Sequence, residues 1–340
     1  DPDRIREVPG ISSKHCEQLR DSYLETRSAR RIITMLAPLD VNAGQAVRMQ
    51  KELGIRAEEL LKERPYEVFE QGLLSFEVAD RLAERQGIPR TAPERVAAGL
   101  LHTLEVAEQK GHLCLHKEHF VRQAVELLRT PGLNRIAVAN EAFEMLKADR
   151  LALYQSHVYR PIMVEAENGT AQCVREMLQR GSLPYIGDLD DEIDQQQEEL
   201  GFVLAAEQRQ AVKTALASPL CIISGGPGTG KTSIQRVFLN IYRKAFPDAD
   251  IICCAPTGRA ARRLEQSTGL PACTVHKALN LTAGETNTLT MPELVNADLV
   301  LVDEVSMLDM AMTWYLFHAL PPMCRLVLVG DADQLPSVGP

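Results

Sequence analysis

Four short apolar runs stand out in the C-terminal part of the chain. They cover residues 220–224, 251–254, 299–302 and 326–329, and segments with helical spacing lie between them. Strands buried on both faces of a parallel sheet have this unbroken apolar character, whereas half-exposed strands alternate apolar and polar residues. The pattern therefore predicts an α/β domain built on a parallel sheet over residues 201–340.

Residues 1–90 have helical spacing with short turns and a weak internal repeat at an offset of 63 residues. The segment from Val8 to Lys14 resembles a helix-hairpin-helix turn, which would direct backbone N–H groups at a DNA phosphate without reading bases. Gly10 and Lys14 are therefore candidate DNA contacts. In a later copy Leu73 occupies the place of Gly10, where a side chain hinders a tight turn. The alternative is a purely structural helical domain.

The middle of the chain shows no recognisable chemistry. Residues 91–184 predict helices, a short extended piece, a strand over 151–160 and a helix over 162–180, which together suggest a winged-helix-like α+β region. Residues 185–200 contain seven acidic side chains and no basic one, and we interpret them as an acidic linker or a solvated helix face.

Charge and cysteine content exclude little. The chain has 340 residues and a formal net charge of −9, but nearly all of the excess lies in the acidic stretch, so a polyanionic partner is neither favoured nor excluded. The eight cysteines show no metal-ligand spacing, which favours reduced thiols in a cytoplasmic protein. No apolar run is as long as a membrane span, and the first residues do not resemble a signal peptide.

Residues 225–232 read GGPGTGKT, the sequence of a phosphate-binding P-loop. The glycines let backbone N–H groups turn toward the β-phosphate, Lys231 reaches the β- and γ-oxygens, and the Thr232 hydroxyl binds Mg²⁺. An apolar run precedes the loop and a helical pattern follows it, so the anion would lie at a helix N-terminus. The residues expected to bind ATP here are Gly225, Gly226, Pro227, Gly228, Thr229, Gly230, Lys231, Thr232 and Ser233.

Further polar residues lie next to the other predicted strands. Asp303 and Glu304 follow the run 299–302, where we expect Asp303 to hold Mg²⁺ and Glu304 to deprotonate the attacking water. Gln334 follows the last run and is placed to sense the γ-phosphate. Gln208 precedes the first run, and its amide offers both a donor and an acceptor to adenine.

These motifs together resemble the superfamily 1 DNA helicases, and closely the RecD-like group. The most specific pieces are residues 255–261 (APTGRAA) and 303–306 (DEVS). The N-terminal hairpin region is similar to the longer RecD-like subclass, which works without the nuclease complex.

The resemblance implies an ATP-driven motor that moves 5′ to 3′ on single-stranded DNA or at a junction with duplex, in DNA recombination or repair. It implies DNA contacts at Pro256, Thr257, Gly258, Arg259, Thr274 and His276. It favours a free-standing enzyme over one with RecB- and RecC-like partners.

The chain also departs from this family's pattern. It ends at Pro340, before a second motor domain with arginine fingers, and begins inside a hairpin repeat. We therefore expect a fragment truncated at both ends that binds nucleotide but hardly hydrolyses it. Two alternatives are a nucleotide-gated DNA-binding module and the helicase segment of a conjugative relaxase.

Overall fold

The computed structural model describes residues 29–39, 41–181, 188–281, 289–334, 337 and 339–340. The chain divides into two compact units, one formed by residues up to 106 and 115–158, the other by residues 107–114 and 159–340. The predicted hairpin contacts Gly10 and Lys14 lie outside the described residues.

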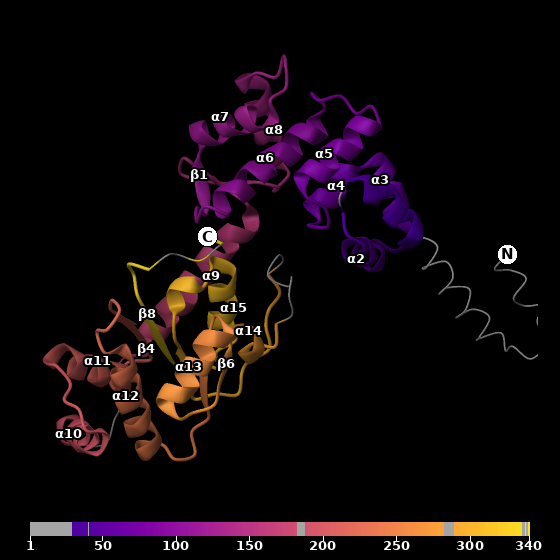
Figure 1. The fold of residues 1–340 in the computed structure, drawn as a ribbon. Helices are drawn as coiled ribbons and strands as arrows, with labels where there is room; N and C mark the ends of the chain where they lie inside the picture. Colours follow the sequence, from indigo (N-terminus) through magenta and orange to yellow (C-terminus); the bar gives the residue numbers. More distant parts are fainter. Residues whose placement is uncertain (1–28, 40, 182–187, 282–288, 335–336, 338) are drawn as a thin grey trace, which may run out of the picture. The chain divides into compact units, whose positions relative to one another are not determined.

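The N-terminal unit is mainly helical (Figure 1). Several of these helices are capped at the N-terminus by the side chain of the preceding residue. Asn42 accepts a hydrogen bond from the N–H of Gln45, and Asn134 accepts one from the N–H of Ala137. After residues 29–36 the helices are α2 (Ala43–Leu53), α3 (Ala57–Glu63), α4 (Pro65–Glu70), α5 (Phe76–Arg85), α6 (Pro93–Glu108), α7 (Lys117–Leu128) and α8 (Arg135–Lys147), with 3-10 turns at Ala37–Leu39 and Gly54–Arg56.

The turn between α4 and α5 explains the degraded repeat. Gly72 has a φ of 72°, a backbone conformation that favours glycine, so the turn does contain a glycine, one position before the aligned site. Leu73, at the aligned position, is buried with Leu74 in the core of the unit. This copy of the repeat therefore contributes a packed helical pair.

The segment predicted as one strand over 151–160 forms two. The strands β2 (Ala152–Tyr154) and β3 (His157–Tyr159) join β1 (Cys114–His116) in a sheet of order β1-β3-β2. Gln155 lies between them with a φ of 54°, which reverses the chain. The order α6, β1, α7, α8, β2, β3 agrees with the expected winged-helix-like region.

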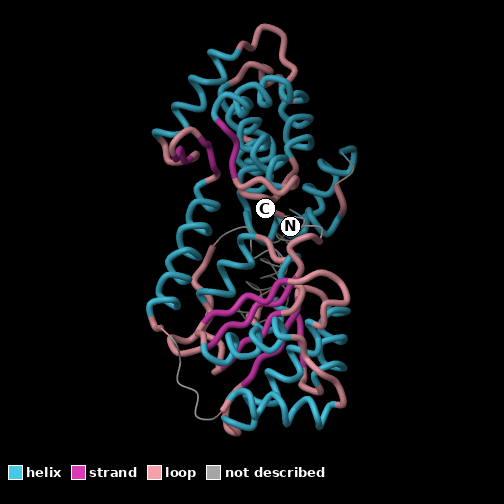
Figure 2. The backbone as a smooth tube through the Cα atoms, turned by 90° about the vertical axis from the view of Figure 1, so that its left-hand side faces the viewer, coloured by secondary structure: helices cyan, strands magenta, loops and turns pink. Residues whose placement is uncertain are grey.

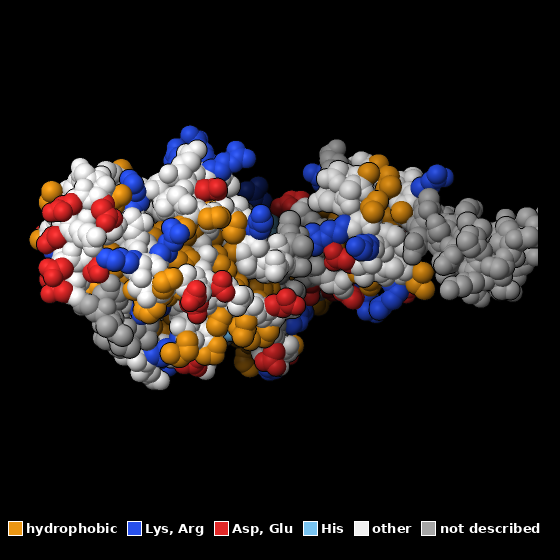
Figure 3. All heavy atoms as spheres, turned by 90° about the horizontal axis from the view of Figure 1, so that it is seen from below, with side chains coloured by type: hydrophobic (Ala, Val, Ile, Leu, Met, Phe, Trp, Pro, Cys, Tyr) orange, Lys and Arg blue, Asp and Glu red, His pale blue; other side chains and the backbone are white. Residues whose placement is uncertain are grey.

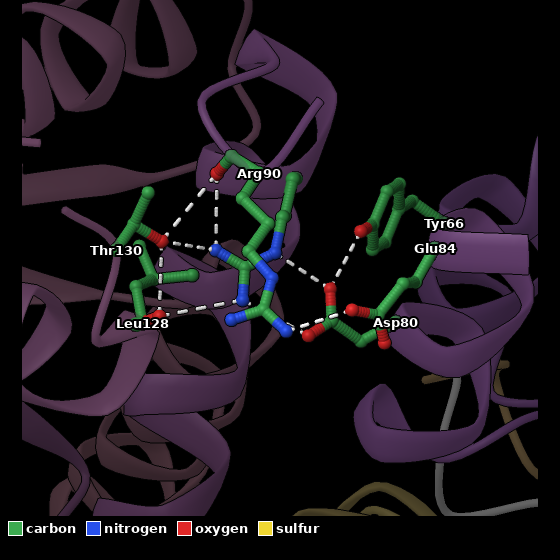
Figure 4. Close-up of polar contacts among 7 residues, drawn as sticks. Tyr66, Asp80, Glu84, Arg90, Leu128 and Thr130 are labelled. Carbon is green, nitrogen blue, oxygen red and sulfur yellow. Dashed lines mark hydrogen bonds and ion pairs between the residues drawn. The ribbon is translucent and has the colours of Figure 1, made fainter. Parts of the chain in front are cut away.

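A buried arginine ties the helices of this unit together (Figure 4). Arg95 is 5% exposed, and its Nε and Nη2 donate to Asp80 at 2.6 and 2.9 Å. Tyr66 donates to the same carboxylate at 2.7 Å. The other guanidinium bonds go to Thr130 and to the carbonyls of Arg90 and Leu128. One charged pair thus links α4, α5, α6 and the end of α7.

The C-terminal unit contains the predicted parallel sheet. The strands are β4 (Leu220–Ser224), β5 (Ile251–Ala255), β6 (Ala272–Thr274), β7 (Leu299–Val302) and β8 (Arg325–Gly330), in the order β4-β8-β7-β5-β6. All of the pairings in this sheet are parallel. The four predicted strands are confirmed, and the short β6 is an addition.

Helices cover both faces of this sheet (Figure 2). Neighbouring residues of one strand enter different cores: Cys253 packs with one cluster and Cys254 with the other, as period-two geometry requires. The helices are α9 (Pro161–Gln179), α10 (Leu189–Leu200), α11 (Ala206–Ala217), α12 (Lys231–Ala245), α13 (Gly258–Thr268), α14 (Val275–Ala278) and α15 (Met310–His318).

Strand β4 departs from the prediction of burial on both faces. It lies at the edge of the described sheet, and Ile222 is 66% exposed although its neighbours Cys221 and Ile223 are buried. At Ile222 no helix of the described chain covers this face of β4, so the apolar run is well buried only on the face of Cys221 and Ile223.

The expected acidic linker is largely a packed helix. Residues 189–200 form α10, where Ile193 is fully buried in the sheet's core. Its carboxylates pair with bases of α11 and α12: Asp190 with Arg209 and Lys213, and Glu192 with Lys244. Figure 3 shows acidic side chains gathered at the end of the unit where α10 lies. The composition identified the solvated face and missed the apolar one.

The predicted boundary at residue 184 also differs from the structure. Helix α9 belongs to the C-terminal unit, where it packs on α15. A Cβ on Gly169 would lie 2.6 Å from Nε1 of Trp314, so the glycine permits this close packing. No helix in the described part of the chain is both long and apolar enough to cross a membrane.

The Arg95–Asp80 pair gives a first prediction. Asp80→Asn keeps the shape of the side chain but leaves a buried guanidinium without its counter-charge, which costs about 3 kcal/mol. We expect amide hydrogen exchange in α4–α6 of the intact protein to report that loss. Glu84→Gln is the control, because Glu84 and Arg90 are both well exposed and such pairs contribute little to stability. Equal effects of the two variants would contradict the prediction.

The same pair predicts a pH dependence. Burial alone would raise the pKa of Asp80, but the hydrogen bonds from Arg95 and Tyr66 outweigh it and lower the pKa. A carboxyl with a lowered folded pKa contributes fully above its unfolded pKa of about 3.9 and loses the contribution as pH falls through the folded value. The difference in exchange between wild type and Asp80→Asn should therefore shrink below about pH 4.

Candidate nucleotide-binding site

The predicted P-loop connects β4 to α12, so the order strand, loop and helix is confirmed. Gly228 and Gly230 have φ values of 75° and 84°, which other residues rarely adopt. The Lys231 ammonium donates to the carbonyl of Gly226 at 3.0 Å and to that of Gly225. In this state the lysine holds the loop closed on itself, at the place where a phosphate oxygen would be its acceptor.

Two of the loop glycines permit close contacts, and two face open space. A Cβ on Gly225 would lie 2.6 Å from Oγ1 of Thr229, and one on Gly230 would lie 2.3 Å from Nε2 of Gln208. Nothing lies within 4 Å of a Cβ on Gly226 or Gly228. The loop is therefore packed against the side chains of Thr229 and Gln208 at two glycines and open at the other two.

Gln208 lies beside this loop at the start of α11. Its Oε1 accepts from the N–H of Ala205 at 2.8 Å, and its Nε2 donates to the carbonyl of Thr229 at 2.8 Å. Both ends of the amide are thus engaged, one with the helix start and one with the P-loop. An adenine contact would require these bonds to be exchanged.

The predicted acidic pair follows β7. The Asp303 N–H donates to the carbonyl of Cys254 on β5 at 3.0 Å, which fixes the backbone at the sheet's edge. Burial raises the pKa of the Asp303 carboxyl, opposed by the backbone N–H of Glu304, by the nearby amide of Gln235 and by the charge of Lys231. Glu304 has a φ of 55° and a ψ of 42°, an unusual conformation for a side-chain-bearing residue and one that clusters at functional sites.

The end of β8 completes the site. The N–H of Gly225 donates to the carbonyl of Gly330 at 3.2 Å, so the P-loop begins against this strand. Asp331 is 3% exposed and accepts from the N–H of Asp333 at 3.0 Å. Gln334 is exposed, and its N–H donates to the Asp331 carbonyl at 3.3 Å. The parallel sheet thus gathers the P-loop, Asp303 and the segment of Gln334 at one edge.

The predicted DNA-contacting segments are neighbours at the same edge. After β5 come Pro256, Thr257, Gly258 and Arg259. Thr274 ends β6, where it pairs with Ala255 of β5, and His276 follows it. The hydroxyls of Thr257 and Thr274 cap α13 and α14. The side chains of Arg259 and His276 are exposed.

The residues present fit a Mg²⁺-bound nucleoside triphosphate. Thr232 at the start of α12 and Asp303 supply the oxygen ligands that Mg²⁺ prefers, and Mg²⁺ takes its remaining ligands from phosphates and water. Among the described residues no group of three or more His, Cys, Asp or Glu side chains could hold a metal on its own.

Comparisons with known proteins agree with this geometry. Residues 208–340 match the family described as AAA domain, and residues 25–114 match the ATP-dependent RecD2 DNA helicase HHH domain. Over 99% of its length the chain is 31% identical to the ATP-dependent RecD2 DNA helicase of Deinococcus radiodurans. The chain is RecD2-like.

The chain spans about half the length of that relative, 48% of the Deinococcus radiodurans RecD2. It spans 28% of the RecBCD enzyme subunit RecD of Mycolicibacterium smegmatis. The latter is 38% identical over 39% of this chain. Among solved structures, Pif1 helicase from Candida albicans is similar over 40% of this chain and 34% of its own, with 23% identity and a TM-score of 0.29.

Two buried residues of this RecD2-like site were missed by sequence reasoning. Asp331 lies in the segment singled out for Gln334, and only its burial distinguishes it. Gln235 lies on α12 and is 1% exposed. The available signal for Gln235 was its spacing, because it lies three residues before the buried Phe238 on an otherwise apolar stripe.

The lysine geometry gives the second prediction. Lys231→Ala removes one charge-assisted hydrogen bond to phosphate and should weaken nucleotide binding by about 10- to 100-fold. The measurement is the Kd of a fluorescent ATP analogue. Lys213→Ala is the control, because Lys213 pairs with Asp190 away from the loop, and its Kd should not change. A similar loss in both variants would contradict the assignment.

Proposed function

We propose that the protein containing this chain is an ATP-dependent helicase or translocase on single-stranded DNA that moves 5′ to 3′ in recombination or repair. The observation that carries the proposal is the convergence of the P-loop, Asp303 and the segment of Gln334 at one sheet edge, beside the loops after β5 and β6. The direction and the pathway rest on the RecD-like resemblance.

In this proposal each residue of the site has one task. Bound Mg²⁺ neutralises charge on the β- and γ-phosphates. Lys231 and the P-loop N–H groups bind the phosphates, and Thr232 and Asp303 hold the metal. Glu304 takes the proton of the attacking water, Gln334 contacts the γ-phosphate, and Gln208 meets adenine after giving up its present partners.

The loops after β5 and β6 suit a motor that ignores sequence. Arg259 and His276 are exposed at the edge of the sheet that also carries the nucleotide site. A change at the bound nucleotide can therefore be transmitted to the DNA contacts over a short distance. Phosphate contacts carry no sequence information and give strong, salt-dependent binding. The partner is single-stranded DNA or its junction with duplex.

The rest of the protein is expected to be needed for turnover. Since the chain spans 48% of its RecD2 relative, we expect it to bind nucleotide alone but to hydrolyse it slowly. An arginine supplied from outside the first motor domain contributes about 10³ to 10⁵ in rate. The match to the RecD2 helix-hairpin-helix family supports a free-standing enzyme over a RecBCD-type complex.

Arg259 tests the DNA contact. In the full-length protein Arg259→Ala should weaken binding of single-stranded DNA and reduce the slope of log K against log salt by about 0.7, the value for one lost phosphate contact. Arg243→Ala is the matched control, since Arg243 is an exposed arginine near the C-terminal end of α12, whose N-terminal end is at the P-loop. Equal slopes for wild type and Arg259→Ala would remove Arg259 from the DNA site.

Glu304 tests the motor itself. ATPase activity of the full-length protein should rise strongly with single-stranded DNA, and Glu304→Gln should lower it by about 10²- to 10⁴-fold, the usual contribution of a general base, with nucleotide binding unchanged. Activity that ignores DNA would favour a nucleotide-gated binding module. Normal activity in Glu304→Gln would exclude Glu304 as the base.

A further inference from the structure

Gln235 occupies a position on α12 that apolar residues otherwise fill. It lies one turn after Thr232, and Phe238 and Tyr242 follow it on the same stripe, both buried against the sheet. Helix α12 starts at the P-loop, so this stripe begins at the nucleotide site (Figure 1). A glutamine here places an amide between the phosphate loop and the core.

The amide of Gln235 is buried without being satisfied. The residue is 1% exposed, and its Nε2 makes no hydrogen bond of good geometry. A buried donor without a partner costs about 1–3 kcal/mol, and an apolar side chain of the same shape avoids that cost. Packing alone therefore does not account for a glutamine at this place.

The position of Gln235 beside Asp303 supplies the missing reason. The Gln235 amide, one turn after Thr232 on the buried stripe of α12, is among the groups that hold down the pKa of the Asp303 carboxyl against its burial. Among the described residues only three buried side-chain polar atoms lack a partner, and two of them, on Gln235 and Ser306, come from elements that meet at the nucleotide site. Hydrogen bonds of this kind are often poorly aligned without ligands and tighten in the complex.

We propose that Gln235 is a positioning residue for the metal: its amide holds one oxygen of the Asp303 carboxylate so that the other is directed at the Mg²⁺ bound with the nucleotide. The inference rests on the proposed nucleotide function and deepens it. Groups that orient a metal-binding carboxylate affect metal affinity by about 10- to 100-fold when they are changed. If Gln235 only filled space, changing it would leave the metal affinity unchanged.

The test separates metal binding from folding. In the full-length protein, Gln235→Met keeps the length of the side chain and removes the amide. We expect the fluorescent ATP analogue to bind equally well in EDTA, while the MgCl₂ concentration that gives half of the tightening rises about 10- to 100-fold. The melting temperature should stay the same or rise, because the unpaired donor is gone.

Gln196→Met is the matched control. Gln196 is also a buried glutamine of the same unit, 5% exposed, but its amide is satisfied by Glu199 and Asn240. Its replacement should lower the melting temperature and leave the Mg²⁺ dependence unchanged. The two variants thus have opposite expected effects on stability and on metal binding.

Gln235→Asn is a second test variant, which keeps the inference testable if Gln235→Met does not fold. It keeps an amide but withdraws it by one methylene, and it should lose Mg²⁺ affinity as Gln235→Met does. Wild-type Mg²⁺ dependence in both variants would overturn the inference and leave the nucleotide site intact. Failure of the wild-type protein to bind the analogue, with or without Mg²⁺, would overturn the proposed function and the inference together.

Discussion

The parallel pairing of β4, β8, β7 and β5 is the constraint on which the rest of the site depends. Parallel strands all end at the same edge, and the pairs Ser224–Gly330 and Val302–Leu328 set how far each strand reaches. Because the side-chain period of a strand is two residues, a slip of one residue would exchange the two apolar cores and move Asp303 relative to the P-loop. The buried faces thereby fix the chemistry at the edge.

Three local departures from relaxed structure lie at this edge. Glu304 adopts a left-handed conformation, Gly330 leaves room for Val305 where a Cβ would come within 2.7 Å, and Gln235 leaves a donor unsatisfied. The N-terminal unit instead satisfies its buried Arg95 with bonds to Asp80, to Thr130 and to the carbonyls of Arg90 and Leu128 (Figure 4). Unsatisfied or strained groups are costly, so those at this edge are candidates for compensation by a bound ligand.

The sequence predicted the sheet and the P-loop because both depend on local patterns. Unbroken apolar runs mark buried strands, and glycines before Lys231 mark a loop that few other functions require. It predicted α10 poorly, because one buried Ile193 among many acids is too weak a signal against composition. It missed the assignment of α9 to the C-terminal unit, because the fit of Gly169 against Trp314 is a contact between distant residues.

Under the proposed function, Gln208 would couple the base of a nucleotide to its phosphates. Its two amide bonds, to Ala205 and to Thr229, connect the start of α11 to the P-loop. If adenine takes both bonds, the exchange itself contributes little net free energy, since hydrogen bonds are replaced one for one. A base with the wrong donor and acceptor pattern would instead leave the amide unpaired, at a cost of about 1–3 kcal/mol. Under the proposed function, Gln208 therefore contributes selectivity for adenine more than affinity. Because it also bonds to Thr229, a change in its partners alters the loop that binds the phosphates.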